Sequence, residues 1–443
     1  MDHNINRRDF LKSSIATGVG VTLLGQARLH AQSPNNRIVL AIAGIHGRGS
    51  ALAQQFTALP GCRIGSVIDV DSRYLDKAAT EIEKMQGSRP KTFKDFRKAL
   101  DDRDIDSLVV ATPDHWHAPM AIEAVKAGKH VYVEKPCSHN CREGELLVEA
   151  SHKYGRLVQM GNQRRSIGQV QEMVQEIREG VIGNVYLTKC YFTRKRGTIG
   201  FGKQVPAPDY LDWDLWQGPA PRVPYRDNVH PYNWHWFWNW GTGEALNNGV
   251  HFLDVARWAL GADYPIKVSS LGGRWHYVGQ DDWECPDTQE ILVEFEGGRM
   301  ISWFGRSTND FGPGYKAFGI VFFGSRGILD YDGDSKYTVY DLDNKVVKTS
   351  ARPAKNADQT SAVDPGLEDR HAANFVAAIR GQEKLASPID EGHKSNILGL
   401  LGNVSLRVGR TLNLDKRNGR ILNDQKAAKL WTRQYEPKWE PKV

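Results

Sequence analysis

The segment that most constrains the fold is the apolar run RIVLAIAG, residues 37–44, together with the glycine-rich turn that follows it. A continuous apolar run that ends in glycine is typical of a parallel strand buried on both faces. The turn reads GIHGRG, residues 44–49, and a helical stretch extends from about residue 47 to 58. A second strand, CRIGSVIDVD, carries Asp69 at its end. This order of elements predicts the first βαβ unit of a doubly wound sheet.

The same alternation continues to about residue 160. Strands DSLVVATP, HVYVEKP and GRLVQMG alternate with helices HAPMAIEAVKAG and EGELLVEASHKY. Strands separated by helices of ten or more residues predict a parallel sheet with right-handed crossovers. We therefore expect an α/β chain whose residues 36–160 form a doubly wound, Rossmann-type domain.

Beyond residue 161 the pattern changes. One helix, about 169–179, is followed by longer strands with period-two alternation, such as TQEILVEFEGGRMISWFG. Such alternation predicts half-buried, mostly antiparallel strands. Residues 161–415 are thus expected to form an α+β domain with a large open sheet, and 416–443 a C-terminal tail. Two late helical stretches, EDRHAANFVAAIRG and KSNILGLLGNVSLRVGRTL, have apolar residues at the spacing of core helices.

The N-terminus has the layout of an export signal. Paired Arg7 and Arg8 precede the apolar stretch 15–24, and small and polar residues end at Ala31. This layout predicts a twin-arginine signal over residues 1–31, hence a partner in the twin-arginine export machinery and a periplasmic or otherwise exported protein. An amphipathic N-terminal helix is the alternative. No apolar run is long enough to span a bilayer, so no stable membrane span is expected in the mature chain.

Charge and cysteine content exclude several other classes. The formal net charge of +6 includes no basic run of the kind that binds nucleic acid. Five cysteines are few and odd in number, which argues against a disulfide framework. Cys137 and Cys141 are expected to serve packing, with pairing after export as the alternative. No cluster of cysteine and histidine has the spacing of a metal site, so no metal is predicted.

The glycine turn indicates a dinucleotide site. A pyrophosphate would lie on the backbone N–H groups at the helix N-terminus, and Asp69 would accept hydrogen bonds from the ribose hydroxyls. This favours NAD as the cofactor and leaves NADP open. His46 stands where a glycine normally lets the backbone approach the phosphates. Either the loop uses Gly47 instead or the imidazole contacts the cofactor; a tight turn without ligand is the remaining alternative.

Two further strand ends carry polar motifs. The third predicted strand ends in ATPDHWH, residues 111–117, and the fourth in EKP, residues 134–136. With the glycine loop, these motifs make nearly the whole mature chain resemble the Gfo/Idh/MocA family of sugar and polyol oxidoreductases. The resemblance implies a Rossmann domain followed by an α/β domain whose open sheet often mediates oligomerisation, so a homo-oligomer is expected. It also implies that Lys135 touches cofactor and substrate and that Pro136 follows a cis bond.

The predicted cofactor-binding residues lie in the glycine loop and at the ends of the following strands. They are Gly44, His46, Gly47, Arg48, Gly49, Asp69, Thr112, Pro113, His115, His117, Glu134, Lys135 and Asn162. Removing a hydride from a carbinol carbon requires that a proton leave the oxygen, and an ammonium beside a cationic ring has a lowered pKa. Lys135 is therefore predicted to be catalytic. The alternative is a surface lysine paired with Glu134.

The segment GTGEALNNGVHFLDVARWAL supplies the second predicted catalytic residue. Helical spacing from Asn247 onward would place Asn247, His251, Asp254 and Trp258 on neighbouring turns. The resemblance implies that His251 acts beside the lysine, with Asn247 at a position where the inositol dehydrogenase branch has an aspartate. Asp254 is a substitute partner for the imidazole. A purely structural histidine is the alternative.

An aromatic run, YNWHWFWNW, precedes this segment in a chain with 13 tryptophans. Aromatic rings stack on the apolar faces of sugars, whereas a buried core or a subunit interface would account for the run equally well. The predicted substrate-binding residues are Gln163, Arg164, Trp234, His235, Asn247 and Asp254.

Export and cofactor together restrict the chemistry. An exported dehydrogenase meets no soluble NAD pool, so its cofactor would be loaded before transport and regenerated in place. We expect an oxidoreductase that acts on a carbohydrate hydroxyl with tightly bound NAD. The alternatives are a redox-neutral NAD-dependent glycoside hydrolase or lyase and a non-catalytic sugar-binding protein.

Overall fold

The first sheet has the parallel, doubly wound arrangement that the sequence predicts. The computed structural model describes residues 37–334, 336–350 and 365–443. Six parallel strands lie in the order β3-β2-β1-β4-β5-β6, so the strand order reverses between β1 and β4. Ligands of doubly wound folds bind at this reversal. The strands are β1 (Ile38–Ala43), β2 (Cys62–Ile68), β3 (Lys91–Phe93), β4 (Ser107–Val110), β5 (His130–Val133) and β6 (Val158–Met160).

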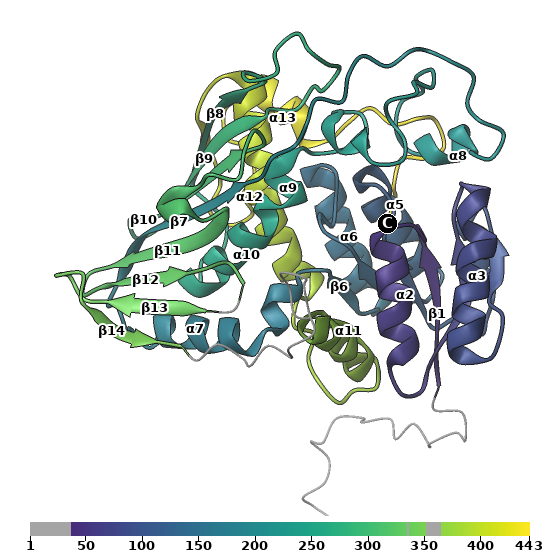
Figure 1. The fold of residues 1–443 in the computed structure, drawn as a ribbon, viewed down its shortest axis with the longest axis horizontal. Helices are drawn as coiled ribbons and strands as arrows, with labels where there is room; N and C mark the ends of the chain where they lie inside the picture. The colour runs from purple at the N-terminus through teal and green to yellow at the C-terminus, as the bar shows by residue number, and fades with distance from the viewer. Residues whose placement is uncertain (1–36, 335, 351–364) are drawn as a thin grey trace, which may run out of the picture. The chain divides into compact units, whose positions relative to one another are not determined.

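Helices cover both faces of this sheet (Figure 1). The apolar side chains of α2 (Arg48–Ala58) and α3 (Ser72–Gln86) form one core with β1 and β2. On the other face, α4 (Phe96–Leu100), α5 (Asp114–Lys126) and α6 (Cys141–Tyr154) join a larger core. Strand β3 and helix α4 were not predicted, because elements of three and five residues are too short to show a period.

The second sheet has nine strands in the order β14-β13-β12-β11-β7-β10-β9-β8-β15. Only β7 and β10 pair in parallel among the described strands of this sheet, so the prediction of a mostly antiparallel sheet is confirmed. Alternate residues of β9 are buried, as the period-two pattern requires. The strands are β7 (Val185–Thr193), β8 (Lys267–Gly273), β9 (Thr288–Phe295), β10 (Arg299–Arg306), β11 (Phe318–Gly324), β12 (Ile328–Tyr331), β13 (Tyr337–Tyr340), β14 (Val346–Thr349) and β15 (Leu412–Asn413).

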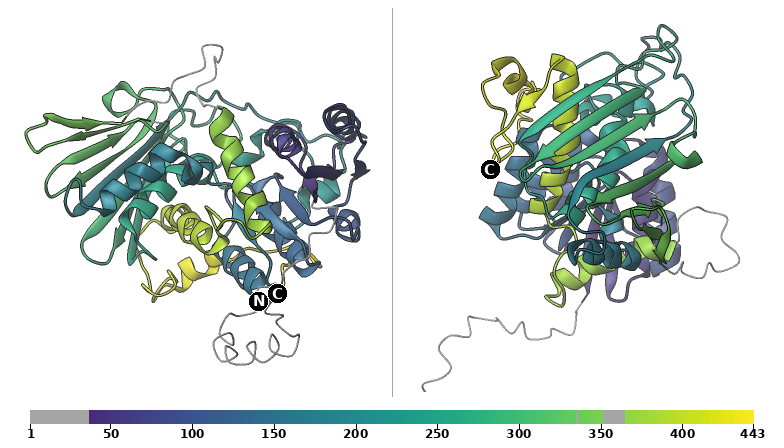
Figure 2. Two further views of the ribbon diagram at one scale, coloured as in Figure 1. Left: turned by 90° about the horizontal axis from the view of Figure 1, so that it is seen from below. Right: turned by 90° about the vertical axis from the view of Figure 1, so that its left-hand side faces the viewer.

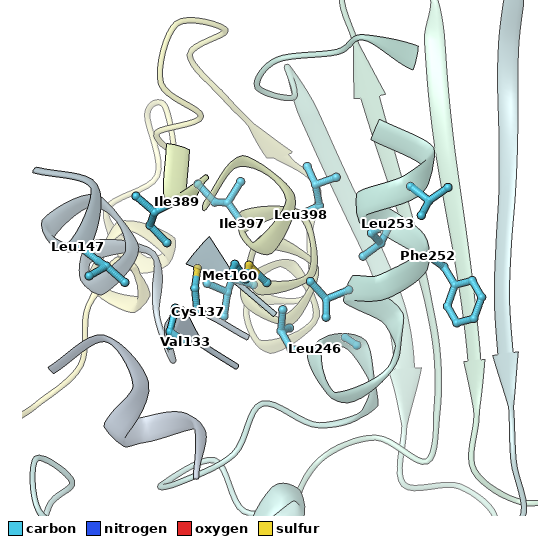
Figure 3. Packing of buried hydrophobic residues seen from close by; sticks show 14 of the residues in the cluster. Val133, Cys137, Leu147, Met160, Leu246, Phe252, Leu253, Ile389, Ile397 and Leu398 are labelled. Atoms are coloured by element: carbon cyan, nitrogen blue, oxygen red, sulfur yellow. The ribbon is translucent and has the colours of Figure 1, made fainter. Parts of the chain in front are cut away.

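Helices gather on one face of the second sheet, as the left view of Figure 2 shows. Helices α10 (Gly249–Leu260) and α12 (Ile389–Val408) pack on its strands, and α7 (Gly168–Arg178) packs against α10. Their apolar side chains continue into the core of the first sheet. Figure 3 shows part of this shared core. Residues of β5, of the loop after β5, of β6 and of α6 pack with residues of α9 (Glu244–Asn247), α10 and α12: Val133, Cys137, Leu147, Met160, Leu246, Phe252, Leu253, Ile389, Ile397 and Leu398.

Helix α11 (Pro365–Ile379) returns to the first sheet. Ala372, Phe375 and Val376 are buried in the core formed by β1, β2 and α2. The core of the first sheet therefore includes residues from beyond the predicted boundary at residue 160. By their contacts, residues 38–443 form one compact unit. The predicted export signal, residues 1–31, lies outside the described residues. Over the described ranges, no helix combines the length and apolarity needed to cross a membrane.

A long connection links β7 to the loop before α9 and reaches the first sheet (Figure 1). We call residues 194–232 the crossing segment. The amide of Ser72 donates to the carbonyl of Tyr210 (2.9 Å), and the amide of Asp212 donates to the carbonyl of Val70 (3.0 Å). These bonds fix the crossing segment directly after β2. The remaining short helices are η1 (Gln163–Ser166), α8 (Trp213–Gln217), η2 (Asn233–Trp236), α9 (Glu244–Asn247), η3 (Pro313–Tyr315), α13 (Gln425–Ala428) and η4 (Lys429–Trp431).

Candidate active site

Three glycines shape the turn between β1 and α2. A Cβ atom on Gly44 would lie 2.5 Å from the carbonyl oxygen of Ala111, and one on Gly49 would lie 1.6 Å from that of Gly44. Both positions therefore exclude any side chain. Gly47 differs, because its φ is +57° but no atom lies within 4 Å of its Cβ position. Open space thus adjoins the N-terminus of α2, which no side chain caps. A phosphate fits such a site by charge and by hydrogen bonding.

His46 does not block this space. Its imidazole packs on Tyr74, with ring centroids 4.3 Å apart, and the residue is exposed. Of the two sequence-based alternatives for this loop, the geometry favours the use of Gly47 as the point of close approach. His46 still lines the cavity and lies at its edge.

Asp69, directly after β2, accepts two backbone hydrogen bonds at the edge of the cavity. Its carboxylate accepts hydrogen bonds from the amides of Ile45 and Asp71, both at 2.9 Å. Burial raises the pKa of Asp69, while these two backbone donors oppose the change. Asp69 therefore holds the glycine turn in place. A carboxylate offers about four acceptor positions, so capacity remains for ribose hydroxyls.

A cavity of about 460 Å³ joins the carboxyl ends of β1, β4 and β5 to the crossing segment and to helices α9 and α10. It brings together most of the predicted residues. Those that line it are Gly44, His46, Gly47, Arg48, Asp69, Thr112, Pro113, His117, Glu134, Lys135, Gln163, Trp234, His235, Asn247 and His251. Gly49, His115, Asn162, Arg164 and Asp254 do not line it.

Lys135 lies at the end of β5 and faces the cavity. Its ammonium donates to the carbonyl oxygen of Asn247 (2.6 Å) and contacts the Oδ1 atom of the same residue (3.3 Å). Burial lowers the pKa of Lys135, although Glu134 and Asp114 act in the opposite direction. The Lys135–Pro136 bond is cis, as the family resemblance implied. A lysine that reaches into a cavity with a lowered pKa is suited to take up or release a proton.

Glu134 is not the ion-pair partner of Lys135. Its carboxylate accepts from Arg48 Nε (2.7 Å), from Gln163 Nε2 (3.0 Å) and from the amide of Lys135 (3.1 Å). Burial would raise the pKa of Glu134, but Arg48 and Lys135 outweigh it and lower the value. A Cβ atom on Gly161 would lie 2.9 Å from this carboxyl group, so the glycine makes room for it. Glu134 thus organises the polar wall of the cavity.

His251 occupies the first turn of α10. Its Nδ1 atom is buried without a hydrogen-bond partner in the described structure, and the same is true of Asn247 Nδ2. Burial lowers the pKa of His251 well below its usual range, and Lys135 and Arg164 add to the effect. The imidazole is therefore neutral near pH 7. Unpaired polar atoms beside a cavity are suited to bind a hydroxyl-bearing ligand.

The predicted continuous helix from Asn247 has to be corrected. Asn247 ends α9, and Asn248, with φ −122°, separates it from α10. Asp254 is not the partner of His251 either. Its oxygens accept from Arg165 Nε (2.9 Å), Arg165 Nη2 (2.8 Å) and Ser395 Oγ (2.6 Å) within the core. The structure therefore removes Asp254 from the predicted substrate-binding residues.

Three other predicted residues also point elsewhere. His115 is buried, and its Nε2 atom lies 2.9 Å from the carbonyl oxygen of Trp216. Arg164 stacks over Phe252, 4.7 Å from the ring centre. Asn162 is 1% exposed, and its amide nitrogen contacts the sulfur of Met160. Each of these residues lies near the carboxyl edge of the first sheet, but its side chain does not line the cavity.

The aromatic run divides between cavity and core. Trp234 and His235 stack with ring centroids 3.6 Å apart, and both line the cavity. Trp236 stacks on Trp283 (4.0 Å) in a separate small cluster, and Trp240 packs with other aromatic residues of the crossing segment. The buried-core interpretation therefore holds for Trp236 and Trp240, whereas Trp234 and His235 line the cavity.

Comparison with known proteins assigns the family. The chain matches three consecutive family profiles: the oxidoreductase family with an NAD-binding Rossmann fold over residues 21–162, a Gfo/Idh/MocA C-terminal domain over 220–330 and a C-terminal alpha/beta domain over 324–441. The chain belongs to the Gfo/Idh/MocA oxidoreductase family. It therefore has an NAD-binding domain.

Individual proteins that resemble this Gfo/Idh/MocA chain share at most about a third of the aligned residues with it in the following three examples. A "Glycosyl hydrolase family 109 protein" from Shewanella putrefaciens is 30% identical over 206 residues, which is 41% of this chain and 45% of that protein. The match thus spans less than half of the relative's length. A levoglucosan dehydrogenase in complex with NADH and levoglucosan superposes with a TM-score of 0.65 at 17% identity, over 85% of this chain and 99% of the other. An aldose-aldose oxidoreductase from Caulobacter crescentus gives 0.64 at 18% identity, over 85% and 100%.

Several cavity residues of this Gfo/Idh/MocA protein were not among the predicted site residues. The crossing segment has no regular period, so its approach to β2 could not be predicted. Lys94, Asp95 and Phe96 follow the short strand β3, which was also missed. The unpredicted lining residues are Ile68, Val70, Tyr74, Lys94, Asp95, Phe96, Asp114, Trp116, Met120, Leu215, Trp216, His230, Pro231 and Tyr232, with Ala43 and Ala111 beside the glycine turn.

No cysteine is among the described residues that line this cavity. All five cysteines are free, and burial raises the pKa of Cys137 to about 12. Within the described ranges, no group of three or more histidine, cysteine or acidic side chains is arranged to hold a metal ion.

Proposed function

We propose that this protein oxidises a hydroxyl-bearing carbon of a carbohydrate and keeps its NAD bound between turnovers. When bound, the dinucleotide supplies a hydride acceptor at the carboxyl edge of the first sheet. The observation that carries the proposal is the position of the Lys135 amine, which faces a cavity shared by the glycine turn and His251. The family assignment and the sugar dehydrogenases of like fold support it.

Each residue then has a definite task. Lys135, as the neutral amine, takes the hydroxyl proton while the carbon loses hydride. Burial favours this neutral form. Neutral His251 lines the same cavity and orients the hydroxyl through its imidazole ring. Trp234 offers an aromatic face to the apolar side of a sugar ring.

A second candidate is redox-neutral cleavage of a glycoside, and the family 109 relative favours it. Transient oxidation of a hydroxyl acidifies the neighbouring C–H, the glycosidic bond is eliminated, water adds, and the hydride returns. This sequence needs a second base. The candidates in the cavity wall are Lys135 and His251, and His235 beside them has an unprotonated Nε2, because its Nδ1 lies 2.7 Å from the Tyr232 carbonyl oxygen and carries the ring proton. Burial lowers the pKa of His235 to about 3, so the ring is neutral.

Incubation of the purified protein with a panel of sugars and aryl glycosides separates these candidates. Accumulation of a keto-sugar with reduced nicotinamide supports oxidation, release of free sugar without net reduction supports cleavage, and neither indicates a sugar-binding protein. Lys135→Met should lower kcat about 10²- to 10⁴-fold. The matched control is Lys126→Met on the surface of α5, where the lysine forms an ion pair with Glu123 (2.8 Å). Equal rates for both variants would disprove the role of Lys135.

We also propose that the protein is exported with NAD already bound and works outside the cytosol as a homo-oligomer. The paired arginines at residues 7 and 8 support the first part. Exposed apolar side chains on the second sheet support the second, since Tyr186 and Leu271 are 54% and 77% exposed. Cell fractionation after replacement of both arginines by lysine tests export, and light scattering of the purified protein tests assembly.

A further inference from the structure

His117 makes two hydrogen-bond contacts that no single neutral imidazole can satisfy. The residue lies near the start of α5 and is 2% exposed. Its Nδ1 atom is 2.6 Å from the carbonyl oxygen of Pro136, and its Nε2 atom is 2.7 Å from that of Thr112. Thr112 follows β4 and Pro136 follows β5, so the ring bridges the ends of two neighbouring strands.

The chemistry of the two partners fixes the charge of the ring. A carbonyl oxygen can only accept, and a neutral imidazole has one N–H and one lone pair. In either neutral tautomer, a nitrogen lone pair would face an oxygen lone pair at 2.6 or 2.7 Å. Both contacts are favourable only when both nitrogens carry a proton. We propose that His117 is held as an imidazolium and that it is a positioning residue, which ties the peptide after Lys135 to the end of β4.

An acidic side chain lies on the same helix. Asp114 is 3% exposed, and its carboxylate accepts from Thr242 Oγ1 at 2.6 Å. Burial raises the pKa of Asp114, and His117 is the strongest influence in the opposite direction. The other titratable groups near the ring are Lys135, on the residue before Pro136, and His115 and His235. Burial lowers the pKa of both histidines to about 3, so they add no charge.

The contact between His117 and the Pro136 carbonyl oxygen acts on the backbone next to the proposed catalytic lysine. The Lys135 amine is held at its tip by the Asn247 carbonyl oxygen (2.6 Å), whereas its backbone continues into the peptide that His117 holds. Loss of one imidazole proton would remove the hydrogen-bond donor to one of the two carbonyl oxygens, that of Pro136 or that of Thr112. We therefore expect the ring to fix the position of Lys135 in the cavity, and its deprotonation to loosen that position.

NMR of the protein as purified, with its cofactor, tests the charge directly. In ¹⁵N-histidine-labelled protein at neutral pH, both ring nitrogens of His117 should resonate as protonated nitrogens. His115 is the internal control, because its Nε2 has a carbonyl partner while Nδ1 has none, which predicts one protonated and one bare nitrogen. His117→Asn and His117→Gln each identify the signal by its loss. A bare nitrogen on His117 would overturn the proposal, whatever the enzyme's substrate proves to be.

Kinetics test the positioning role, and this arm rests on the proposed function. Asparagine can place its amide nitrogen near the Nδ1 position and so keep the donor to Pro136, whereas glutamine reaches the Nε2 position and keeps the donor to Thr112. We expect His117→Gln to lower kcat about 10²-fold with little change in KM, and His117→Asn to lower it less. Wild-type values of kcat in both variants would refute the positioning role, while an inactive wild-type enzyme with a doubly protonated ring would refute only the proposed function.

Discussion

Gly47 offers a direct test of the cofactor site, because its backbone conformation disfavours a side chain although its surroundings leave room for one. The φ of +57° is unfavourable for any residue with a side chain, while no atom lies within 4 Å of the Cβ position. Gly47→Ala should therefore cost about 1–3 kcal/mol of stability through backbone strain alone. The added methyl group would also occupy the space beside the N-terminus of α2, where a phosphate is expected.

The effect on binding follows from the contacts that would be lost. A hydrogen bond to a charged group contributes about 1.5–3 kcal/mol. Since 1.4 kcal/mol is a factor of ten, loss of one backbone contact to the pyrophosphate should weaken NADH binding about 10- to 150-fold. Titration of cofactor-depleted protein with NADH, followed by energy transfer from the tryptophans that line the cavity, measures this change. Urea unfolding of the same preparations measures the stability.

Gly87 provides the matched control. It also has a positive φ, +73°, and no atom within 4 Å of its Cβ position, but it caps the C-terminus of α3 and does not line the cavity. Gly87→Ala should lose about 1–2 kcal/mol of stability and keep the wild-type NADH affinity. If Gly47→Ala bound NADH as tightly as Gly87→Ala does, the placement of the pyrophosphate at this turn would be wrong.

Three further changes have defined outcomes. Burial lowers the pKa of Lys135, so kcat/KM should rise with pH along a limb centred below the ordinary lysine value of about 10.4, and Lys135→Met should abolish the limb. A lysine whose pKa is lower in the folded state than in the unfolded state also costs stability at pH values below the folded pKa, and this cost disappears as the pH rises to the unfolded pKa. Lys135→Met removes the cost, so this variant should unfold at a higher urea concentration than the wild type near pH 7. Asp254→Asn leaves Arg165 without its buried carboxylate and should cost about 3–5 kcal/mol in urea unfolding, with unchanged NADH affinity. Asp69→Asn keeps only one acceptor for two backbone amides and should weaken NADH binding about tenfold in the fluorescence titration.

The parts of the site that the sequence predicts are those set by local pattern. The glycine turn, Asp69 and Lys135 each end or follow a strand whose apolar run is unmistakable, and parallel strands bring such ends to one edge of the sheet. The family resemblance added the role of Lys135 and pointed to His251. Both residues line the same cavity.

The parts that escaped prediction depend on contacts between distant residues. Asp254 has helical spacing from His251, but its partner Arg165 lies 89 residues earlier in the chain, and only the packing of α10 on η1 brings them together. Asn248 interrupts the helix between α9 and α10 without a proline or glycine at that position to signal the break. The sequence places His117 among the predicted cofactor-binding residues. Its two ring nitrogens instead contact backbone carbonyl oxygens, and the positions of these oxygens depend on how β4 and β5 end.

The crossing segment forms one wall of the cavity, yet it belongs to neither sheet and meets the first sheet through main-chain hydrogen bonds after β2. Main-chain bonds place few demands on side-chain identity. Substitutions at positions of the crossing segment outside its buried cluster (Leu211, Trp216, Ala220, Tyr225 and Val229) can therefore alter which ligands enter the cavity, while the cores of both sheets are left intact. Directed evolution of substrate preference would best begin with randomised codons in this stretch.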